Sequence, residues 1–393
     1  MKLTEPTRKA APRVVLRRGW HELGRDLFEA RTMDSSWSPA FAAVDRSRFL
    51  PPLMWPVDPA KRRPVRADRY AGRPRWQRYA DADVPIVTKW DDNARSAIPV
   101  SVAPPPSLVM SMLRDLDVDP GARVLEVGTG VGWTAGLLAH RLGSESLVTV
   151  DVDRQVVTRA QRKLAEARLF PTVLERDLLE GDPIGAPYDR IIASRGLHTI
   201  PAAWIEQARP GGIILAPWRG VYGPHHGLVK LVVAEDGKSA SGLFLRCTEV
   251  MDTRDLWSWP RHADYTARGW PTTIRQSATD RGPGDLIGPL SFILGLLRPD
   301  VAHTVRRHPK DGRLVIRFYS LTDRSWAQAA WIEDGGPGLV CQDGSRSLWH
   351  EVEEAVDRWI SDGRPSIDRY GLTVDIHGIH TPWRDNPQHT PST

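Results

Sequence analysis

The chain lacks several features that would place it in a specialised class. It has two cysteines in 393 residues, so it has no disulfide framework and no cysteine-rich metal site. Its longest apolar stretch, residues 286–297, is about half of a membrane span and is interrupted by two glycines and a proline. The N-terminus has no apolar core of the secretory type, so we expect a cytoplasmic protein without a membrane partner.

The chain also has only a small excess of positive charge. The formal net charge is +5, and the fractions of charged (26%) and hydrophobic (41%) residues are ordinary for soluble globular proteins. The length allows two or three domains. Although the sequence pI is near 9.3, we expect no nucleic-acid partner. The basic residues of the segment 61–78 are interpreted as a solvated surface, with an acidic peptide partner as the alternative.

The most informative stretch is residues 124–133, Val-Leu-Glu-Val-Gly-Thr-Gly-Val-Gly-Trp. A short apolar run typical of a buried strand precedes three glycines, and a helical pattern follows. This order predicts the nucleotide-binding corner of a doubly wound α/β sheet. Glycine suits the turn because a Cβ would keep the backbone away from a ligand, and because such turns often need a positive φ.

Two acids near this turn indicate its ligand. Glu126 lies just before the glycines, where it would repel a phosphate but attract a cationic ligand such as S-adenosylmethionine. The next expected strand ends at Asp151, about 20 residues after the glycines, where such folds bind ribose hydroxyls. A purely structural turn is the alternative, and the pairing of Glu126 with Asp151 argues against it.

Further motifs follow in a recognisable order. They are residues 124–133, Asp151, Arg176-Asp177, residues 188–192 and residues 209–212. In this order they resemble the motifs of class I methyltransferases. The flanking residues 37–51 and 79–85 resemble the N-terminal segment of protein-L-isoaspartate O-methyltransferases, and the resemblance covers about residues 37–251. A branch with a long C-terminal extension methylates an aspartate in ribosomally made peptides, which then closes to an aspartimide. The chain resembles this branch in its length and in residues 84–88 and 106–109.

The resemblance implies a Rossmann-like doubly wound sheet with an N-terminal substrate-covering segment and a C-terminal α+β accessory domain. We place the N-terminal segment at residues 1–98, the S-adenosylmethionine-binding core at 99–255 and the accessory, peptide-recognition domain at 256–393. The implied function is a carboxyl O-methyltransferase that acts on an aspartate of a modified ribosomal peptide and releases S-adenosylhomocysteine. Isoaspartate repair is the first alternative, and a peptide-binding module with a vestigial cofactor site is the second.

The resemblance also implies the residues that bind the cofactor. Asp151 would bind the ribose hydroxyls, and Asp177 the adenine amino group with Leu178 as apolar neighbour. The full set is Glu126, Gly128, Thr129, Gly130, Asp151, Val152, Asp177 and Leu178. A helix cap or a turn is the alternative role of Asp177.

Methyl transfer to a carboxylate needs no general base, because aspartate is ionised at neutral pH. The protein has to align the reacting atoms and orient the carboxylate. The candidates are Ser101, Ser107, Arg195 and His198. An arginine can bind a carboxylate through two parallel hydrogen bonds. The alternatives are a helix cap for Ser107 and a core ion pair for Arg195. Pro104 stands where the isoaspartate enzymes carry a serine, which argues against repair.

The candidates for substrate contact lie in two places. Thr88 and Lys89 belong to the segment expected to cover the site. Trp257 and Trp259 alternate and would share one face of a strand, with core packing as the alternative. The adjacent His225 and His226 would point to opposite faces of a strand, so we expect no metal there.

Periodicity predicts the remaining elements. Helices are expected near residues 21–31, 107–116, 153–164 and 348–360; strands at 124–127, 148–150, 172–174, 190–193, 213–216 and 372–376; and hairpins at 228–249 and 314–332. Residues 51–78, rich in proline and arginine, are expected to form an irregular loop. Asp153 is expected to cap its helix.

Overall fold

The computed structural model describes residues 19–91, 99–248, 250, 260–266, 275–308, 312–331 and 337–387. The chain divides into two compact units: residues 1–121 with 129–175, and residues 122–128 with 176–393. The glycine turn of the sequence motif begins in the second unit and continues into the first. None of the described helices is long and apolar enough to cross a membrane.

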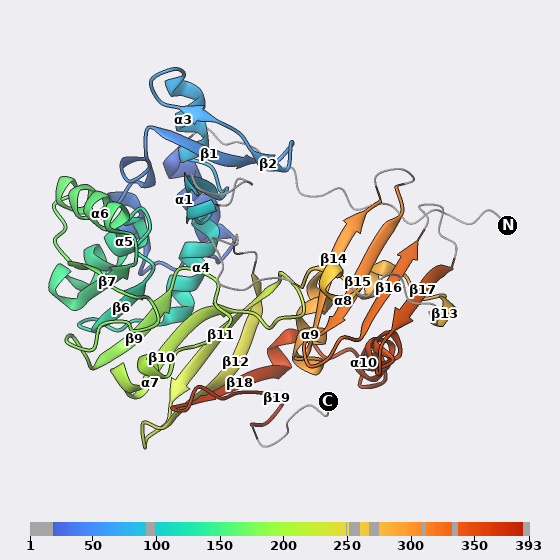
Figure 1. Cartoon of the computed structure of the whole chain (residues 1–393). Helices are drawn as coiled ribbons and strands as arrows, with labels where there is room; N and C mark the ends of the chain where they lie inside the picture. Colours follow the sequence, from blue (N-terminus) through green and yellow to red (C-terminus); the bar gives the residue numbers. More distant parts are fainter. Residues whose placement is uncertain are drawn as a thin grey trace. The chain divides into compact units, whose positions relative to one another are not determined.

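The first unit opens with helices and a small antiparallel sheet (Figure 1). Helices α1 (Trp20–Glu29) and α2 (Ser38–Ala43) come first, followed by the short η1 (Arg46–Arg48). The sheet has the order β2-β1-β4-β5, with β3 also paired to β1. Its strands are β1 (Leu53–Asp58), β2 (Arg63–Pro64), β3 (Ala67–Asp68), β4 (Ile86–Trp90) and β5 (Pro99–Ala103).

The expected irregular loop at residues 51–78 is therefore wrong. The segment contains β1, β2, β3 and the helix α3 (Arg73–Ala80). Met54, Trp76 and Tyr79 are buried and hold these short elements in place. Two-residue strands have no detectable period, and they form here because β1 provides a partner for each of them.

Helix α4 (Pro106–Leu116) begins differently from the prediction. Its N-cap is Pro105, and the Ser107 side chain makes no cap. The backbone N–H of Ser107 instead donates to Oδ1 of Asp83 at 2.8 Å. The helix cap, the alternative role of Ser107, is therefore wrong, because a carboxylate from another segment satisfies this N–H at the helix start.

The rest of the first unit is α/β. Strands β7 (Leu147–Asp151) and β8 (Thr172–Glu175) pair in parallel, and their helices are α5 (Trp133–Leu142) and α6 (Arg154–Glu166), with η2 (Ser144–Ser146) between α5 and β7. The predicted cap is confirmed: Oδ1 of Asp153 accepts the N–H groups of Gln155 and Val156 at 2.9 and 3.4 Å. A Cβ on Gly132 would lie 3.2 Å from that of Ala160, so this glycine lets α5 approach α6.

The second unit contains the larger part of the main sheet. Its strands follow the order β19-β18-β12-β11-β10-β9-β6. They are β6 (Val124–Val127), β9 (Tyr188–Ala193), β10 (Ala208–Trp218), β11 (His226–Val233), β12 (Ser239–Thr248), β18 (Tyr370–Asp375) and β19 (His380–Arg384), with α7 (Ala202–Gln207) before β10. The neighbours β6, β9 and β10 run parallel, and the predicted hairpin β11–β12 is confirmed.

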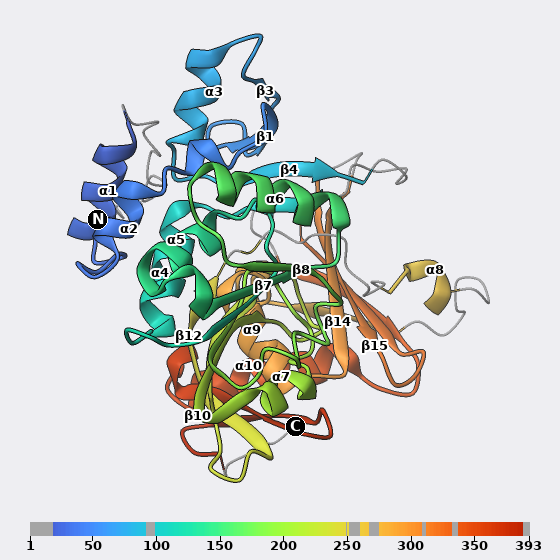
Figure 2. The same cartoon turned by 90° about the vertical axis from the view of Figure 1, so that its left-hand side faces the viewer.

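A second antiparallel sheet lies within the same unit. Its order is β13-β17-β16-β15-β14, and it includes the predicted hairpin β15–β16. The strands are β13 (Arg275–Thr279), β14 (Val301–Arg307), β15 (Leu314–Ser320), β16 (Trp326–Trp331) and β17 (Gly338–Asp343). Helices α9 (Pro289–Leu297) and α10 (Leu348–Ser361) lie on one face and α8 (His262–Tyr265) on the other (Figure 2). Two short turns, η3 (Pro283–Asp285) and η4 (Ile367–Arg369), precede α9 and β18. The chain then returns to the main sheet, since β18 pairs with β12.

One fully buried arginine joins the parts of the N-terminal sheet. The guanidinium of Arg46 donates to the backbone oxygens of Ala82, Val84, Ala103 and Pro104 at 2.8–3.2 Å. Burial lowers the pKa of Arg46 to about 9, although nearby carboxylates oppose the shift. The four carbonyl groups that precede β4 and α4 therefore depend on a single side chain.

We predict that Arg46→Met lowers the free energy of unfolding by about 2–3 kcal/mol, because buried carbonyl oxygens lose their donor. Urea unfolding followed by tryptophan fluorescence measures this change. The control is Arg48→Met, whose exposed side chain donates to the backbone oxygen of Glu166. It should change the free energy by no more than about 0.5 kcal/mol. Equal effects of the two variants would contradict the role given to Arg46.

Candidate active site

In the first unit, the glycine turn is attached to the end of β7. The Thr129 N–H donates to the Val150 oxygen at 3.1 Å, and its hydroxyl lies 2.7 Å from that of Thr149. The Gly130 N–H donates to Oδ2 of Asp151 at 3.0 Å. Because Gly128, Gly130 and Gly132 all have positive φ, the turn has a conformation that other residues rarely adopt.

Asp151, the predicted ribose-binding residue, lies in partly exposed surroundings. Asp151 is half-buried, and its Oδ1 accepts the Asp153 N–H at 3.2 Å. Val152, next along the chain, is 61% exposed, although valine is usually buried. Apart from Gly130 and its two chain neighbours, no described residue has an atom within 4 Å of a Cβ built on Gly130. The turn thus leaves open backbone beside an acid and an exposed apolar side chain.

The predicted substrate contacts of the first unit make specific hydrogen bonds. The buried Thr88 hydroxyl donates to the Ser101 hydroxyl at 2.9 Å and to the backbone oxygen of Ser101 at 3.1 Å. These two candidates therefore lie side by side on β4 and β5. The Lys89 ammonium donates to Oδ2 of Asp153 at 2.5 Å and to Oε1 of Gln155 at 3.3 Å. Lys89 therefore joins β4 to the start of α6.

The bond from Lys89 changes the ionisation of its partner. Burial raises the pKa of Asp153, but the hydrogen bonds from Lys89 and from two backbone N–H groups outweigh burial and lower the pKa overall. The Asp153 N–H is also bound to Asp151. Lys89 thus contacts the loop that carries Asp151, the residue predicted to bind the ribose of the cofactor.

In the second unit, the first acid of the motif is completely buried. Glu126 has 0% exposure, and the Ser194 hydroxyl donates to its Oε1 at 3.3 Å. Ser194 was not predicted as a site residue. It follows the end of β9, the parallel neighbour of β6, and this position is the signal that could have identified it.

The residues after β9 include two predicted catalytic candidates. Arg195 is half-buried, and in the part of the chain that the structure describes its buried Nε has no hydrogen-bond partner. His198 is half-buried three residues later. An arginine nitrogen that is buried without an acceptor is costly, so a bound carboxylate would compensate it.

The remaining candidates have ordinary contacts. Oδ1 of the exposed Asp177 accepts the Leu179 N–H at 2.8 Å, as in a turn, and its adenine role stays a prediction. Leu178 is buried, and its backbone oxygen accepts from Trp204. Trp257 and Trp259 lie outside the described residues. Among those described, no group of three or more His, Cys, Asp or Glu side chains is arranged to hold a metal.

We predict that Lys89→Met lowers the free energy of unfolding by on the order of 1 kcal/mol at neutral pH. The folded pKa of Asp153 lies below its unfolded value of 3.8, so the pair stabilises the fold above that pH. Its contribution is lost as the pH falls through the folded pKa. In urea titrations, the difference in the free energy of unfolding between variant and parent should be smaller at about pH 2.5 than at about pH 7.

Lys163→Met is the control, because Lys163 pairs with Glu166 on the exposed side of α6. It should change stability little at either pH. A difference for Lys89→Met that is independent of pH would show that packing, and not the ion pair, is responsible.

Comparison with known proteins identifies the family of the chain. The family model "Protein-L-isoaspartate(D-aspartate) O-methyltransferase" matches residues 74–239. The protein-L-isoaspartate O-methyltransferase of Pyrococcus horikoshii is 33% identical over 164 residues, which cover 42% of this chain and 70% of the relative. The corresponding protein of a Bradyrhizobium species is 36% identical over 132 residues, covering 32% of this chain and 57% of the relative.

A solved structure with the same name shares the fold. It aligns with a TM-score of 0.52 and 18% identity, over 93% of this chain and 99% of its own. The Rossmann-like architecture with a C-terminal addition is therefore confirmed. The chain belongs to the protein-L-isoaspartate O-methyltransferase family of S-adenosylmethionine-dependent carboxyl methyltransferases.

Proposed function

We propose that this protein transfers a methyl group from S-adenosylmethionine to an aspartate carboxylate in a ribosomally made, modified peptide. The observation that supports it most is Glu126, a completely buried acid directly before the positive-φ glycines. A buried carboxylate is stabilised by a nearby positive charge, and the cofactor supplies one on its sulfur and one on its amino group.

The other contacts of the donor follow from the same motif. The Asp151 carboxylate accepts hydrogen bonds from the ribose hydroxyls, and the exposed Val152 packs against the adenine. Backbone groups of Gly128, Thr129 and Gly130 line the donor, and Asp177 binds the adenine amino group.

The acceptor carboxylate is oriented by the Arg195 guanidinium, with Ser101 and His198 as further donors. A carboxylate oxygen forms the new bond to the methyl carbon as the carbon–sulfur bond breaks, and the electron pair stays on sulfur. The acceptor needs no base, because it is already ionised. The next backbone nitrogen of the peptide then attacks the ester carbonyl, its proton leaves with the methoxy group as methanol, and an aspartimide forms.

Repair of isoaspartate is the second candidate, and the names of the relatives favour it. The solved structure of that name aligns over nearly this whole chain, so a C-terminal addition does not by itself favour a peptide-modifying enzyme. Pro104, in place of the family's serine, is the residue that favours the first candidate.

Two peptides that differ only in one residue, L-aspartate or L-isoaspartate, test the proposal. Incubation with S-adenosylmethionine and mass spectrometry should show esterification of the aspartyl peptide, followed by loss of methanol. Methylation of the isoaspartyl peptide alone would establish repair.

Asp151→Ala should abolish donor binding in calorimetry, whereas the exposed control Asp119→Ala should not. Donor binding without methylation of any carboxyl group would favour the binding module.

We predict that Arg195→Gln raises KM for the peptide about tenfold and leaves the KM for the donor unchanged, because the acceptor loses a charged hydrogen-bond partner. Arg195→Lys should recover only part of the loss, since a lysine cannot form two parallel bonds. The control is Arg209→Gln, which removes a half-exposed ion pair with Asp189 on the same sheet. Unchanged peptide kinetics in Arg195→Gln would exclude it from the acceptor site.

A further inference from the structure

The N-terminal sheet carries a concentrated positive charge that the methyl-transfer chemistry does not use. The basic surface consists of the exposed side chains Lys61, Arg62, Arg63, Arg66, Arg69, Arg73, Arg75 and Arg78. Asp68 is the single acid between residues 61 and 78, so this segment has a formal charge of +7, whereas the whole chain has +5. The rest of the chain is therefore net acidic.

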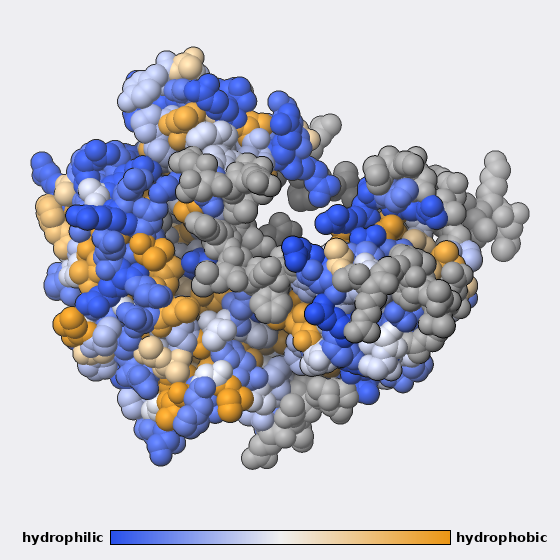
Figure 3. Space-filling model, viewed as in Figure 1, coloured by the Kyte–Doolittle hydropathy of each residue, from blue (hydrophilic) through white to orange (hydrophobic). Residues whose placement is uncertain are grey.

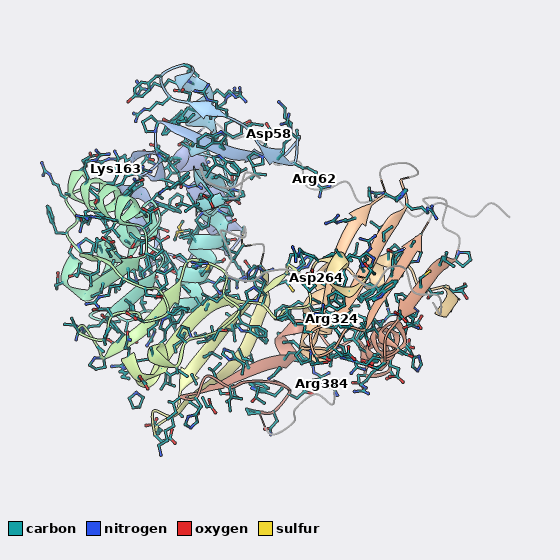
Figure 4. The ribbon with its side chains drawn as sticks, viewed as in Figure 1. Asp58, Arg62, Lys163, Asp264, Arg324 and Arg384 are labelled. Atoms are coloured by element: carbon teal, nitrogen blue, oxygen red, sulfur yellow. The ribbon has the colours of Figure 1, made fainter. Side chains whose placement is uncertain are left out.

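The basic surface belongs to ordered secondary structure. Its residues lie on β2, on α3 and in the turns around β3, and β1 pairs with both β2 and β3. Arg62 lies at the tip of the turn between β1 and β2 (Figure 4), and this tip is hydrophilic in the space-filling view (Figure 3). The cationic side chains are therefore carried by a folded backbone.

The nearby acids are already engaged. Asp68 accepts from Arg66 and from the Tyr70 N–H, both at 3.0 Å. Asp58 accepts from the Tyr79 hydroxyl at 2.6 Å and from two backbone N–H groups. In the part of the chain that the structure describes, Arg62, Arg63 and Arg73 have no carboxylate partner. Their charge is available to an external anion.

The sheet that carries the basic surface also contains β4, the strand of the predicted substrate contacts. Strand β1 pairs with β4, with Trp55 opposite Val87, and the rings of Trp55 and Trp90 meet edge to face at 6.0 Å. Both tryptophans are half-exposed. The same β4 carries Thr88 and Lys89, so the basic surface and the predicted substrate contacts are parts of one small sheet.

We propose that the basic surface binds an acidic segment of the substrate, a run of Asp or Glu residues separate from the methyl-accepting aspartate. The proposal rests on the proposed function in that this segment and the acceptor belong to one peptide. A short acidic segment fits this surface because its eight cations lie within the 18 residues 61–78, a span that a short anionic segment can match.

Fluorescence anisotropy with a labelled glutamate-rich peptide tests the surface directly, and its glutamine analogue is the neutral probe. The triple variant Arg62→Glu, Arg63→Glu, Arg73→Glu should weaken binding of the glutamate peptide at least about tenfold. Raising the salt from about 0.05 to about 0.5 M should weaken binding to the parent in the same direction. The control triple variant Arg25→Glu, Arg162→Glu, Arg358→Glu makes the same change in net charge at exposed sites elsewhere and should bind nearly as the parent does.

Equal binding of the glutamate peptide by the surface variant and the parent would overturn the proposal. A labelled single-stranded oligonucleotide that binds the parent more tightly than the peptide, and loses binding in the surface variant, would overturn it in favour of nucleic acid. If the surface variant does not fold, the parent decides, because the glutamine analogue must bind much more weakly than the glutamate peptide.

Methylation kinetics separate this proposal from the proposed function. An acceptor peptide with a glutamate tail should have a KM about tenfold lower than the same peptide with a glutamine tail, at similar kcat, and the surface variant should remove the difference. Equal KM values for the two tails in the parent would contradict the proposal. If neither peptide is methylated, the proposed function fails, and the anisotropy measurement still decides the role of the basic surface.

Discussion

The site depends on the attachment of a glycine turn to the end of one strand. Two hydrogen bonds make it: the Thr129 N–H to the Val150 oxygen, and the Gly130 N–H to the Asp151 carboxylate. The second bond uses one oxygen of Asp151 to hold the turn, and its other oxygen holds the Asp153 N–H. One acid therefore shapes the loop that it is also predicted to use for binding the ribose. A positive φ at Gly130 is the backbone condition that allows this arrangement.

Charge is arranged in two opposite ways along the chain. Where the donor is proposed to bind, a buried carboxylate, Glu126, precedes the turn and favours a cation. On the basic surface, Arg62, Arg63 and Arg73 have no carboxylate partner among the described residues and favour an anion. In the same N-terminal sheet, β4 contributes Lys89, whose ammonium bonds the Asp153 carboxylate at the start of α6. The buried carboxylate suits the cationic donor, and the basic surface suits an acidic segment of the same substrate, separate from the methyl-accepting aspartate.

The secondary structure shows where local patterns suffice. Strands β6, β7, β8 and β9 and helices α6 and α10 agree with their predictions, because each is an apolar run or an amphipathic period long enough to recognise. Strands β2 and β3 have two residues each, too few to show a period, and they form by pairing with β1. The six residues of β1 include Pro56, and proline is uncommon inside a strand, so the segment resembles a loop. The Ser107 side chain does not cap α4. The Asp83 carboxylate accepts the backbone N–H of Ser107 instead, and it comes from a different segment.

The sequence by itself determined the α/β class, the glycine turn with its two acids and the cationic character of the ligand, because these follow from residue order over a few positions. Only the tertiary structure decided which side chains meet. It joined Thr88 to Ser101 and Lys89 to Asp153, brought Ser194 to Glu126, and returned β18 to the main sheet beside β12. Such contacts join residues up to more than a hundred positions apart, and no local period or propensity contains that information.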